Sequence, residues 1–262
     1  NRDLHLSLRR QRQMCIRDRH GGARSMHMGA ATMILAVEEV IGKAKGVAAV
    51  LLQAEIDELS FKNGSFTSGS GNRSVTLKEV AIAARDNRIA PHLEGMGLDT
   101  FTKRENAPFT FPNGCHAAEV EIDPETGSVT LIKYIMVDDY GSLVNPVLTE
   151  GQLHGGVAQG IGQALMEFVS FDENTGQLLS GSLMDYTLPR AAMLPNFEAT
   201  LEGAPTQANI LGVKGVGQAG CIAAPQTIVH AVLNALSPLK IIHLDMPLTS
   251  QSIWRAISAS RS

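Results

Sequence analysis

A glycine string near the C-terminal end of the chain constrains the fold more than any other feature. Residues 214–220 read KGVGQAG, so that Gly215, Gly217 and Gly220 have the spacing G-x-G-x-x-G. In dinucleotide-binding proteins this spacing lies between a strand and a helix of a βαβ unit, where the backbone approaches a phosphate closely. The string therefore raises the question of whether the chain is a wound parallel sheet.

The residues around the string fit a βαβ unit only in part. A strand over 208–213, a helix over 222–236 and a second strand over 241–245 would have the required order. However, Asp245 lies well beyond the usual separation of about 20 residues from the glycines. Strands and helices also do not alternate regularly upstream. An NAD-binding βαβ protein is therefore a distant alternative.

Composition restricts the class of protein. The chain has 44% hydrophobic residues, enough for a substantial core, and its net charge of −4 argues against a nucleic-acid or anionic-membrane partner. No apolar run approaches the roughly 20 residues that span a bilayer. The cysteines, Cys15, Cys115 and Cys221, lack the spacing of a zinc or iron–sulfur site and are typical of a reducing compartment. We expect a cytoplasmic protein.

The first nineteen residues are unlike the rest of the chain. They carry six arginines without apolar periodicity, which is typical of a basic arm or a transit peptide. Residues 10–18, however, read RQRQMCIRD and resemble a translated sequencing adapter. We expect residues 1–19 to be a non-native or disordered segment, and the native protein to extend further upstream than this fragment.

Local patterns predict helices and hairpins in the first half. Residues 28–54 have helical periodicity, with a possible bend at Gly42 or Gly46. Asn63-Gly64 predicts a tight hairpin turn. Thr76 and Glu79 form a capping box for a helix that ends near residue 85, and residues 88–113 read as a surface connection.

The second half alternates strands, turns and helices. Residues 118–122 and 129–137 predict a hairpin, with Glu119 and Glu121 on its wet face. Residues 171–178 indicate another strand–turn–strand, and Thr249 caps a final helix. Helices and antiparallel hairpins in this mixed order predict an α+β fold.

A glycine-rich helix is the least expected element. A second capping box, Thr149 to Gln152, opens a helix that contains glycine at positions 151, 155, 156, 160 and 162. Each interior glycine costs roughly 0.5–1 kcal/mol relative to alanine, so propensity alone does not explain this helix. Something must approach its backbone closely, either a neighbouring element or a cofactor.

Five strings occur in order along residues 22–258. They are ARSM (23–26), TFPNGCH (110–116), EGQLHGGVAQGIGQ (150–163), DYTLPR (185–190) and KGVGQAGCIAAP (214–225). Together they resemble the molybdenum-binding large subunit of the xanthine dehydrogenase and aldehyde oxidase family, most of all the group that includes aerobic carbon monoxide dehydrogenases. The resemblance implies that residues 20–262 are the C-terminal part of a molybdenum-cofactor-binding domain.

The resemblance also implies a cofactor, partners and binding residues. The cofactor would be molybdenum held by molybdopterin, in its cytosine dinucleotide form. Electrons would leave through FAD-binding and [2Fe-2S] subunits or domains, in a dimer of heterotrimers. By position, the cofactor-binding residues are Arg24, Ser25, Gln159, Gly160, Gly215, Val216 and Gly217. Helix starts near Ser25 and Ile222 would suit the anionic phosphates.

Gln218 departs from the family pattern. In the family that the chain resembles, a glutamate at this position is the catalytic base in the hydroxylation of a small substrate such as an aldehyde or an N-heterocycle. A glutamine amide has no protonation equilibrium near neutral pH and cannot be that base. Loss of a general base typically costs on the order of 10²–10⁴ in rate. The resemblance, taken with Gln218, therefore implies either a variant hydroxylase subunit or a catalytically silent homologue.

The remaining polar residues have simpler interpretations. Asp138 and Asp139 follow a strand and are expected to be solvated or structural. The spacing of the histidines at 27, 116, 154 and 243 predicts no protein-ligated metal. The family's other metal-binding loops are absent from this chain, so its substrate is not readable and the fragment alone is expected not to retain cofactor.

Overall fold

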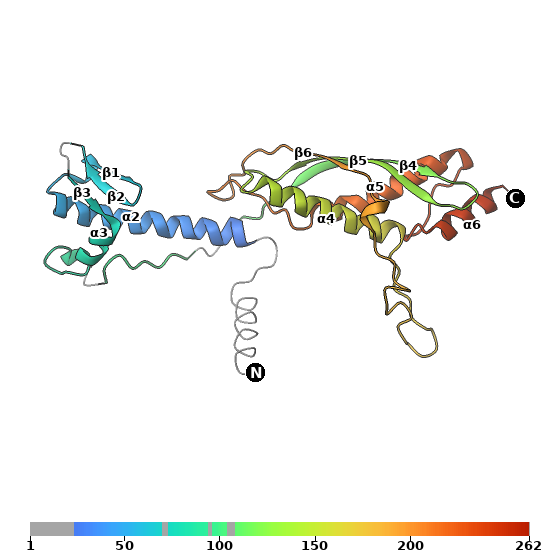
Figure 1. The fold of residues 1–262 in the computed structure, drawn as a ribbon, viewed down its shortest axis with the longest axis horizontal. Coiled ribbons are helices and arrows are strands. Elements are labelled where there is room, and N and C mark those ends of the chain that lie inside the picture. The colour runs from blue at the N-terminus through green and yellow to red at the C-terminus, as the bar shows by residue number, and fades with distance from the viewer. Residues whose placement is uncertain (1–23, 70–72, 94–95, 104–107, 262) are drawn as a thin grey trace. The chain divides into compact units, whose positions relative to one another are not determined.

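The computed structural model describes residues 24–69, 73–93, 96–103 and 108–261 (Figure 1). These residues form two compact units. One unit spans residues 28–107, and the other contains residues 108–261 together with 24–27. The segment predicted to be non-native, residues 1–19, lies outside the described residues.

The unit of residues 28–107 is built on one long helix. A short π-helical segment, η2 (Ser25–Ala30), leads into α2 (Ala31–Leu52), which confirms most of the helix predicted over 28–54. Three short antiparallel strands follow: β1 (Leu59–Lys62), β2 (Ser65–Ser68) and β3 (Ser74–Thr76). The core lies between the sheet and α2, where Val47 and Phe66 are fully buried.

Both local predictions in this unit are confirmed. Asn63 and Gly64 have φ of 51° and 76°, the left-handed conformation that the hairpin turn requires. Thr76 caps α3 (Leu77–Ala83): its hydroxyl accepts from the Glu79 N–H, and Glu79 Oε2 accepts from the Thr76 N–H at 2.8 Å. The described part of 88–113 contains only the short 3₁₀ turn η4 (Pro91–Leu93) and the first residue of the next strand.

The other unit contains a three-stranded sheet covered by helices. β4 (Asn113–Ile122) and β5 (Val129–Asp139) form the predicted antiparallel hairpin, and β6 (Phe197–Leu201) joins β5 in parallel. Along β5, Tyr134, Met136 and Asp138 are buried while the intervening residues are exposed. This period of two places one face of the sheet against the helices.

From residue 108 onward, three α-helices complete the described part of this unit (Figure 1). α4 (Pro146–Leu165) packs along α5 (Ala219–Leu236), α5 also packs on β4, and α6 (Ser250–Ser260) adds Ile253 and Ile257 to the same core. The 3₁₀ turns η5 (Ala191–Met193) and η6 (Ser237–Leu239) lie in the connections. The architecture confirms the α+β prediction.

Residues 219–239 satisfy the length and hydropathy of a membrane span, contrary to the prediction that no run approaches that length. Their mean hydropathy reaches 1.3 within α5 and η6. One face of α5 buries Ala224, Ile228 and Val232 against α4 and the sheet, so core packing accounts for the apolar residues on that face.

Two predictions about element boundaries are wrong. α4 begins at Pro146, with Asn145 as its N-cap: Asn145 Oδ1 accepts from the Leu148 N–H at 3.1 Å. Proline is preorganised for the first helical position, so the helix starts before the predicted capping box. Thr149 instead lies inside the helix and donates to the Asn145 carbonyl. The strand–turn–strand over 171–178 reduces to a single bridge between Phe171 and Leu178.

The βαβ alternative is also wrong. Residues 208–213 form turns with one isolated bridge, and residues 241–245 have no regular secondary structure. Only the predicted helix is present, as α5, and it begins at Ala219 rather than at 222. The G-x-G-x-x-G spacing therefore lies in a loop at a helix start without the flanking strands of a dinucleotide fold.

Candidate functional site

The loop of residues 214–218, hereafter the GVGQ loop, is held to the end of β5 by its first residue. The Lys214 N–H donates to the Tyr140 carbonyl at 2.9 Å, and Lys214 Nζ lies 2.5 Å from Asp139 Oδ2. Lys214 is the main reason that the pKa of Asp139 is lowered, and the Gly141 N–H donates to the same carboxylate. Asp139 is therefore structural, which was one of the two predicted alternatives.

A buried asparagine fixes the turn that precedes the loop. Asn209 Nδ2 donates to the Val213 carbonyl at 2.9 Å, and Asn209 Oδ1 accepts from the Val213 N–H at 3.2 Å. At Gly212, φ is 66°, so the turn requires a left-handed residue there. Sequence reasoning missed Asn209, because a lone asparagine at the start of a short apolar stretch gives no signal of burial.

The other end of the loop is fixed by α4. Gln152 Nε2 donates to the Gly217 carbonyl at 2.8 Å, which joins two segments 65 residues apart. The Gly217 Cα faces open space, with no atom within 4 Å of where a Cβ would lie. Sequence reasoning also missed Gln152, although it is one of the polar residues of the glycine-rich helix.

Gln218 is the N-cap residue of α5, and its side chain is exposed. Its φ and ψ are −119° and −1°, its side chain makes no capping hydrogen bond, and its carbonyl accepts from the Ile222 N–H. Free backbone N–H groups and the helix dipole at such a helix start favour an anion. The structure thus places the predicted catalytic position at a solvent-facing helix N-terminus.

Four of the five glycines of α4 divide into two groups, whereas a Cβ at the fifth, Gly162, would overlap Glu167 and Pro189. A Cβ at Gly160 would lie 2.6 Å from the Ala224 Cβ, and one at Gly156 would lie 3.0 Å from the Cys221 nitrogen. Gly220 of α5 makes the matching close approach to α4, because a Cβ at this position would lie 2.6 Å from the Leu153 carbonyl oxygen. Helix packing alone therefore explains the glycine at 160, and its cofactor contact stays a prediction.

The second group faces away from α5. Gly151 and Gly155 have no atom within 4 Å of a built Cβ, and Gln159 beside them is exposed. Gln152 and Gln159 are seven residues apart, so they lie on the same side of the helix and are separated by about 10 Å along its axis. This open, amide-bearing side of α4, with the GVGQ loop at one end, is the candidate cofactor face.

Arg24 and Ser25 lie at the described N-terminal boundary. Ser25 begins the π-helical segment η2, and Arg24 is half-buried. Arg24 is already helical and the residues before it lie outside the described ranges, so the helix start near Ser25 and its role in phosphate binding both stay predictions. Across the described ranges, no three His, Cys, Asp or Glu side chains gather as a metal site.

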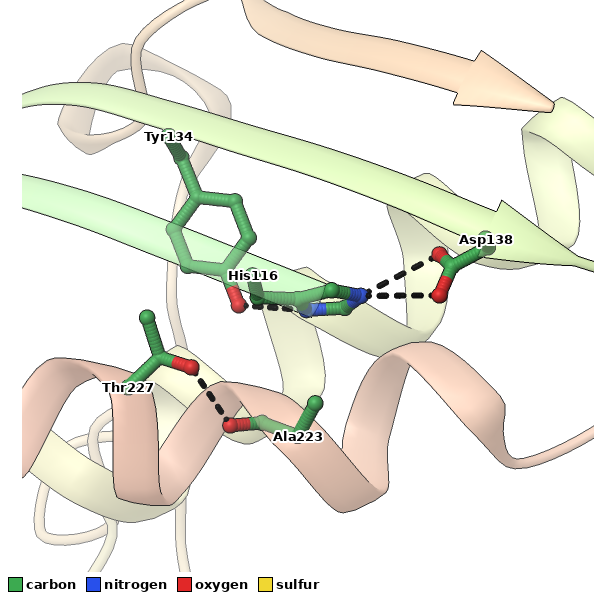
Figure 2. Close-up of polar contacts among 5 residues, drawn as sticks. All are labelled: His116, Tyr134, Asp138, Ala223 and Thr227. Atoms are coloured by element: carbon green, nitrogen blue, oxygen red, sulfur yellow. Dashed lines mark hydrogen bonds and ion pairs between the residues drawn. The ribbon is translucent and has the colours of Figure 1, made fainter. Parts of the chain in front are cut away.

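A buried polar cluster lies under the sheet end that carries the loop (Figure 2). His116 Nδ1 is 2.8 Å from the Tyr134 hydroxyl, and His116 Nε2 is 3.1 Å from Asp138 Oδ2. The His116 and Asp138 side chains are 1% and 5% exposed. Asp138 is therefore not solvated, and period-two alternation with Tyr134 would have indicated its burial.

The tyrosines of this cluster are held neutral. Burial is the main cause that raises the pKa of Tyr134 to about 12, while hydrogen bonding to Thr227 opposes the rise and the charge of Asp138 adds to it. Burial and then the Asp138 charge also raise the pKa of Tyr140. The sequence placed His116 in one of the family strings and its spacing argued against a metal ligand, but neither observation indicated the cluster.

Comparison with known proteins identifies the group to which these features belong. Residues 13–195 match the model of the molybdopterin cofactor-binding domain. The chain is 32% identical, over 90% of its length, to the carbon monoxide dehydrogenase large chain of Hydrogenophaga pseudoflava, and 37% identical, over 82%, to the nicotine 6-hydroxylase large subunit of Paenarthrobacter nicotinovorans. It spans 29% and 26% of those two proteins.

Solved structures of similar proteins come from the same group of enzymes. A Cu,Mo-containing carbon monoxide dehydrogenase matches 92% of this chain with a TM-score of 0.79 at 29% identity, and the match covers 30% of that chain. Quinoline 2-oxidoreductase from Pseudomonas putida 86 matches 84% of this chain with a TM-score of 0.70 at 32% identity, and the match covers 28% of that chain. Both comparisons agree with the α+β architecture.

Proposed function

Because the chain belongs to the molybdopterin cofactor-binding domain family, within the xanthine dehydrogenase and aldehyde oxidase group, we propose that it is part of a hydroxylase large subunit. The observation that carries the proposal is the GVGQ loop, which is fixed at both ends and lies at the N-terminus of α5. The proposed substrate is an aldehyde, an N-heterocycle or a similar small molecule.

The proposed cofactor is molybdenum-molybdopterin in its cytosine dinucleotide form. The residues present fit such a group, because Gly151, Gly155 and Gly217 leave open space beside Gln159 and the loop. Gln159 would bind it through its amide, and the backbone of Gly215, Val216 and Gly217 would approach it closely. The bound group would accept two electrons from the substrate, and the added oxygen would come from water.

The helix start of α5 would hold the anionic part of the cofactor. Its free N–H groups and dipole favour negative charge, and the apolar Ile222 in the first turn brings no competing anion. Arg24 and Ser25 are proposed as further ligands. Gly160 would contribute to cofactor binding only through its backbone, because residues of α5 fill the space where its Cβ would lie.

Gln218 determines how active the subunit is. Its exposed amide can donate and accept hydrogen bonds, so it can orient a substrate or a water, but it cannot accept a proton as the family's glutamate does. A second candidate function rests on this residue: a catalytically silent homologue that binds cofactor or partner without turnover.

The proposed assembly is a heterotrimer with FAD-binding and [2Fe-2S] subunits, paired into a dimer and located in the cytoplasm. Relatives that are named as a large chain, a large subunit and a subunit gamma of a complex support a multi-subunit enzyme. This chain spans less than a third of those relatives, so the fragment alone is expected not to retain cofactor. Stoichiometric molybdenum in the purified 262-residue chain would contradict that expectation.

The test uses the complete subunit, co-expressed with its flavin and iron–sulfur partners. Molybdenum content, released pterin and dye-linked oxidation are measured for the parent protein and for Gln218→Glu. Bound pterin with turnover supports the hydroxylase, and bound pterin without turnover supports the silent homologue. Absence of pterin would reject both.

Gln218→Glu separates the two forms of the enzyme proposal. If the missing base limits the rate, the substitution raises dye-linked oxidation on the order of 10²–10⁴-fold. An unchanged or lower rate would show that this subunit does not use a base at this position. Gln159→Ala serves as the binding variant, because it removes an exposed amide and should lower molybdenum content without lowering stability.

A further inference from the structure

The segment between α4 and η5 is long and irregular. Residues 167–190, hereafter the arm, contain no helix or strand and only the single bridge between Phe171 and Leu178. Figure 1 shows this segment extending away from α4, α5 and the sheet. Connections longer than about 12–15 residues without regular structure are uncommon in compact domains, and they are usually functional or disordered. The contacts of the arm decide between these two cases.

Hydrogen bonds within the arm define its conformation. The Leu179 N–H donates to the Ser170 carbonyl and the Asp172 N–H donates to the Gln177 carbonyl, both at 2.8 Å. At the tip, Asp172 Oδ1 accepts from the Thr175 N–H, also at 2.8 Å. The arm is therefore a preformed segment, and a functional explanation is needed for it.

The base of the arm is anchored on the last turn of α4. The Tyr186 hydroxyl donates to Glu167 Oε2 at 2.5 Å, and the Glu167 N–H donates to the Gly162 carbonyl at 2.8 Å. A Cβ at Gly162 would overlap Glu167 Oε1 and would lie 2.8 Å from the Pro189 Cδ. Gly162 thus makes room for both ends of the arm, which meet at one point on α4.

The arm exposes apolar side chains along its whole length. Every Phe, Val, Leu and Met residue between 167 and 190 is exposed, and Leu183 and Met184 are 75% and 92% exposed. The sequence from 168 to 189 contains three acidic residues and no Lys or Arg. Single exposed apolar residues are normal on a protein surface, whereas a large exposed apolar patch marks an interaction site. The arm therefore has the side chains of a surface that is covered in the complete protein.

A turn of the same kind elsewhere in the chain is already docked. Residues 123–127 and 172–176 share the pattern D-x-x-T-G, and Gly127 and Gly176 have φ of 72° and 69°. Gly127 packs against α6, because a Cβ at this position would lie 2.6 Å from the Trp254 nitrogen. Gly176 has no atom within 4 Å of a built Cβ. The same turn is thus docked on a helix of its own chain in one place and open in the other.

The remainder of a large subunit is the occupant that fits the arm. This chain spans only 29% and 26% of the carbon monoxide dehydrogenase large chain and the nicotine 6-hydroxylase large subunit that it resembles. A segment of the same polypeptide acts at an effective concentration on the order of millimolar, so it covers an apolar surface before a separate molecule can. Separate redox partners meet through interfaces at the small end of the size range, so they fit an apolar arm less well.

We propose that residues 167–190 are a docking arm, which packs its exposed Phe, Leu and Met side chains into an apolar surface on the rest of the large subunit. This proposal rests on the proposed function only in that the chain is part of a larger subunit. Because the base of the arm is fixed on α4, docking also fixes the rest of the subunit relative to the candidate cofactor face.

The test is oxidation of Met184 by hydrogen peroxide, which needs no substitution. The complete large subunit is expressed without its flavin and iron–sulfur partners, and its mass is followed by light scattering over a dilution series. Methionine sulfoxide is measured by mass spectrometry in peptides that contain Met184 and, as the buried reference, Met136. We expect Met184 of the monomeric subunit to react at least about tenfold more slowly than in urea, as Met136 does. In the 262-residue chain, Met184 should react at nearly its rate in urea.

Two results would overturn the proposal. One is a reaction of Met184 in the monomeric subunit that is as fast as in urea, because the arm would then be uncovered. The other is protection that appears only in the dimer, or only after the partner subunits are added, because the arm would then dock on that molecule.

A matched pair of variants tests the apolar character of the docking. In the complete subunit, Leu183→Glu should raise the oxidation rate of Met184 by roughly tenfold or more, because burial of an unpaired carboxylate is costly. Asn174→Glu adds the same charge at the tip, where the docked turn carries Glu125, and should leave the rate unchanged. An unchanged rate in Leu183→Glu would contradict docking through these side chains.

The oxidation result is independent of the hydroxylase chemistry, since it needs no cofactor, substrate or partner. If Met184 is protected while the complete subunit binds no pterin, the docking arm stands and the hydroxylase proposal fails. If Met184 is unprotected in a subunit that binds pterin, the docking arm alone is rejected.

Discussion

Two long helices of this chain carry interior glycines, and the glycines lie in different surroundings. In α2, Gly42 and Gly46 have no atom within 4 Å of a built Cβ, whereas in α4 a Cβ at Gly160 would overlap α5. The same residue type therefore marks a close helix contact in one element and open space in the other. α4 contains both cases, because Gly151 and Gly155 are as open as the glycines of α2.

This difference shows how to interpret a glycine-rich helix. The two explanations offered by the sequence, a neighbouring element or a cofactor, apply to different sides of the same helix. Packing against α5 accounts for Gly156 and Gly160, and leaves Gly151 and Gly155 unexplained by the protein itself. The open side is therefore where a ligand contact is proposed.

The largest predicted effect on stability is at the packed seam, which is the close contact between α4 and α5 at Gly160. Gly160→Ala places a methyl group 2.6 Å from the Ala224 Cβ and 2.9 Å from the Pro225 Cδ, and should destabilise the chain by about 1–3 kcal/mol. Urea unfolding followed by circular dichroism measures the change. An increase in stability would contradict close packing at this seam.

Removal of a helix N-cap is expected to have the next largest effect on stability. Thr76→Ala and Asn145→Ala each remove an observed N-cap and should lower the free energy of unfolding by about 1 kcal/mol. Thermal unfolding of each variant is compared with the parent chain. No loss of stability in Asn145→Ala would mean that α4 does not depend on this cap.

Substitution of an open glycine in α2 should instead raise the free energy of unfolding. Gly46→Ala adds a methyl group where nothing lies within 4 Å and should stabilise the chain by roughly 0.5–1 kcal/mol through helix propensity. The same unfolding measurement detects it. A destabilising Gly46→Ala would show that α2 has a close neighbour at this position, as α4 does.

The smallest predicted effect on stability concerns the ion pair between Asp139 and Lys214, which anchors the GVGQ loop. The pKa of Asp139 is lowered below its ordinary value of 3.8 by Lys214, so its contribution to stability is present above that value and is lost as the pH falls through the lowered one. Asp139→Asn should therefore weaken the acid dependence of stability below about pH 4, the unperturbed range of aspartate. Acid titration of the parent chain and the variant, with tryptophan fluorescence, compares the two.

The elements with strong local signals were predictable from the sequence. The Asn63-Gly64 turn, the Thr76 capping box and the β4–β5 hairpin all depend on neighbouring residues and are confirmed. The start of α4 was misplaced because two cap signals, Asn145-Pro146 and Thr149, compete within one turn and only the first forms a cap.

Of the candidate site, only the GVGQ loop itself was predictable from the sequence, through its glycine motif. Its supporting contacts join distant segments: Gln152 to Gly217, and Lys214 to Asp139. Such contacts follow from tertiary packing and leave no local pattern in the sequence. His116 and Asp138 were likewise separated by a turn, and the register of the hairpin was needed to bring them together.

The central claim is that the open side of α4 binds the cofactor while the packed side binds α5. The most direct test measures molybdenum content and thermal stability of the complete subunit with Gly155→Leu. Because residue 155 faces open space, the account predicts unchanged or higher stability together with a clear loss of bound molybdenum. Full molybdenum retention in a stable Gly155→Leu protein would contradict it.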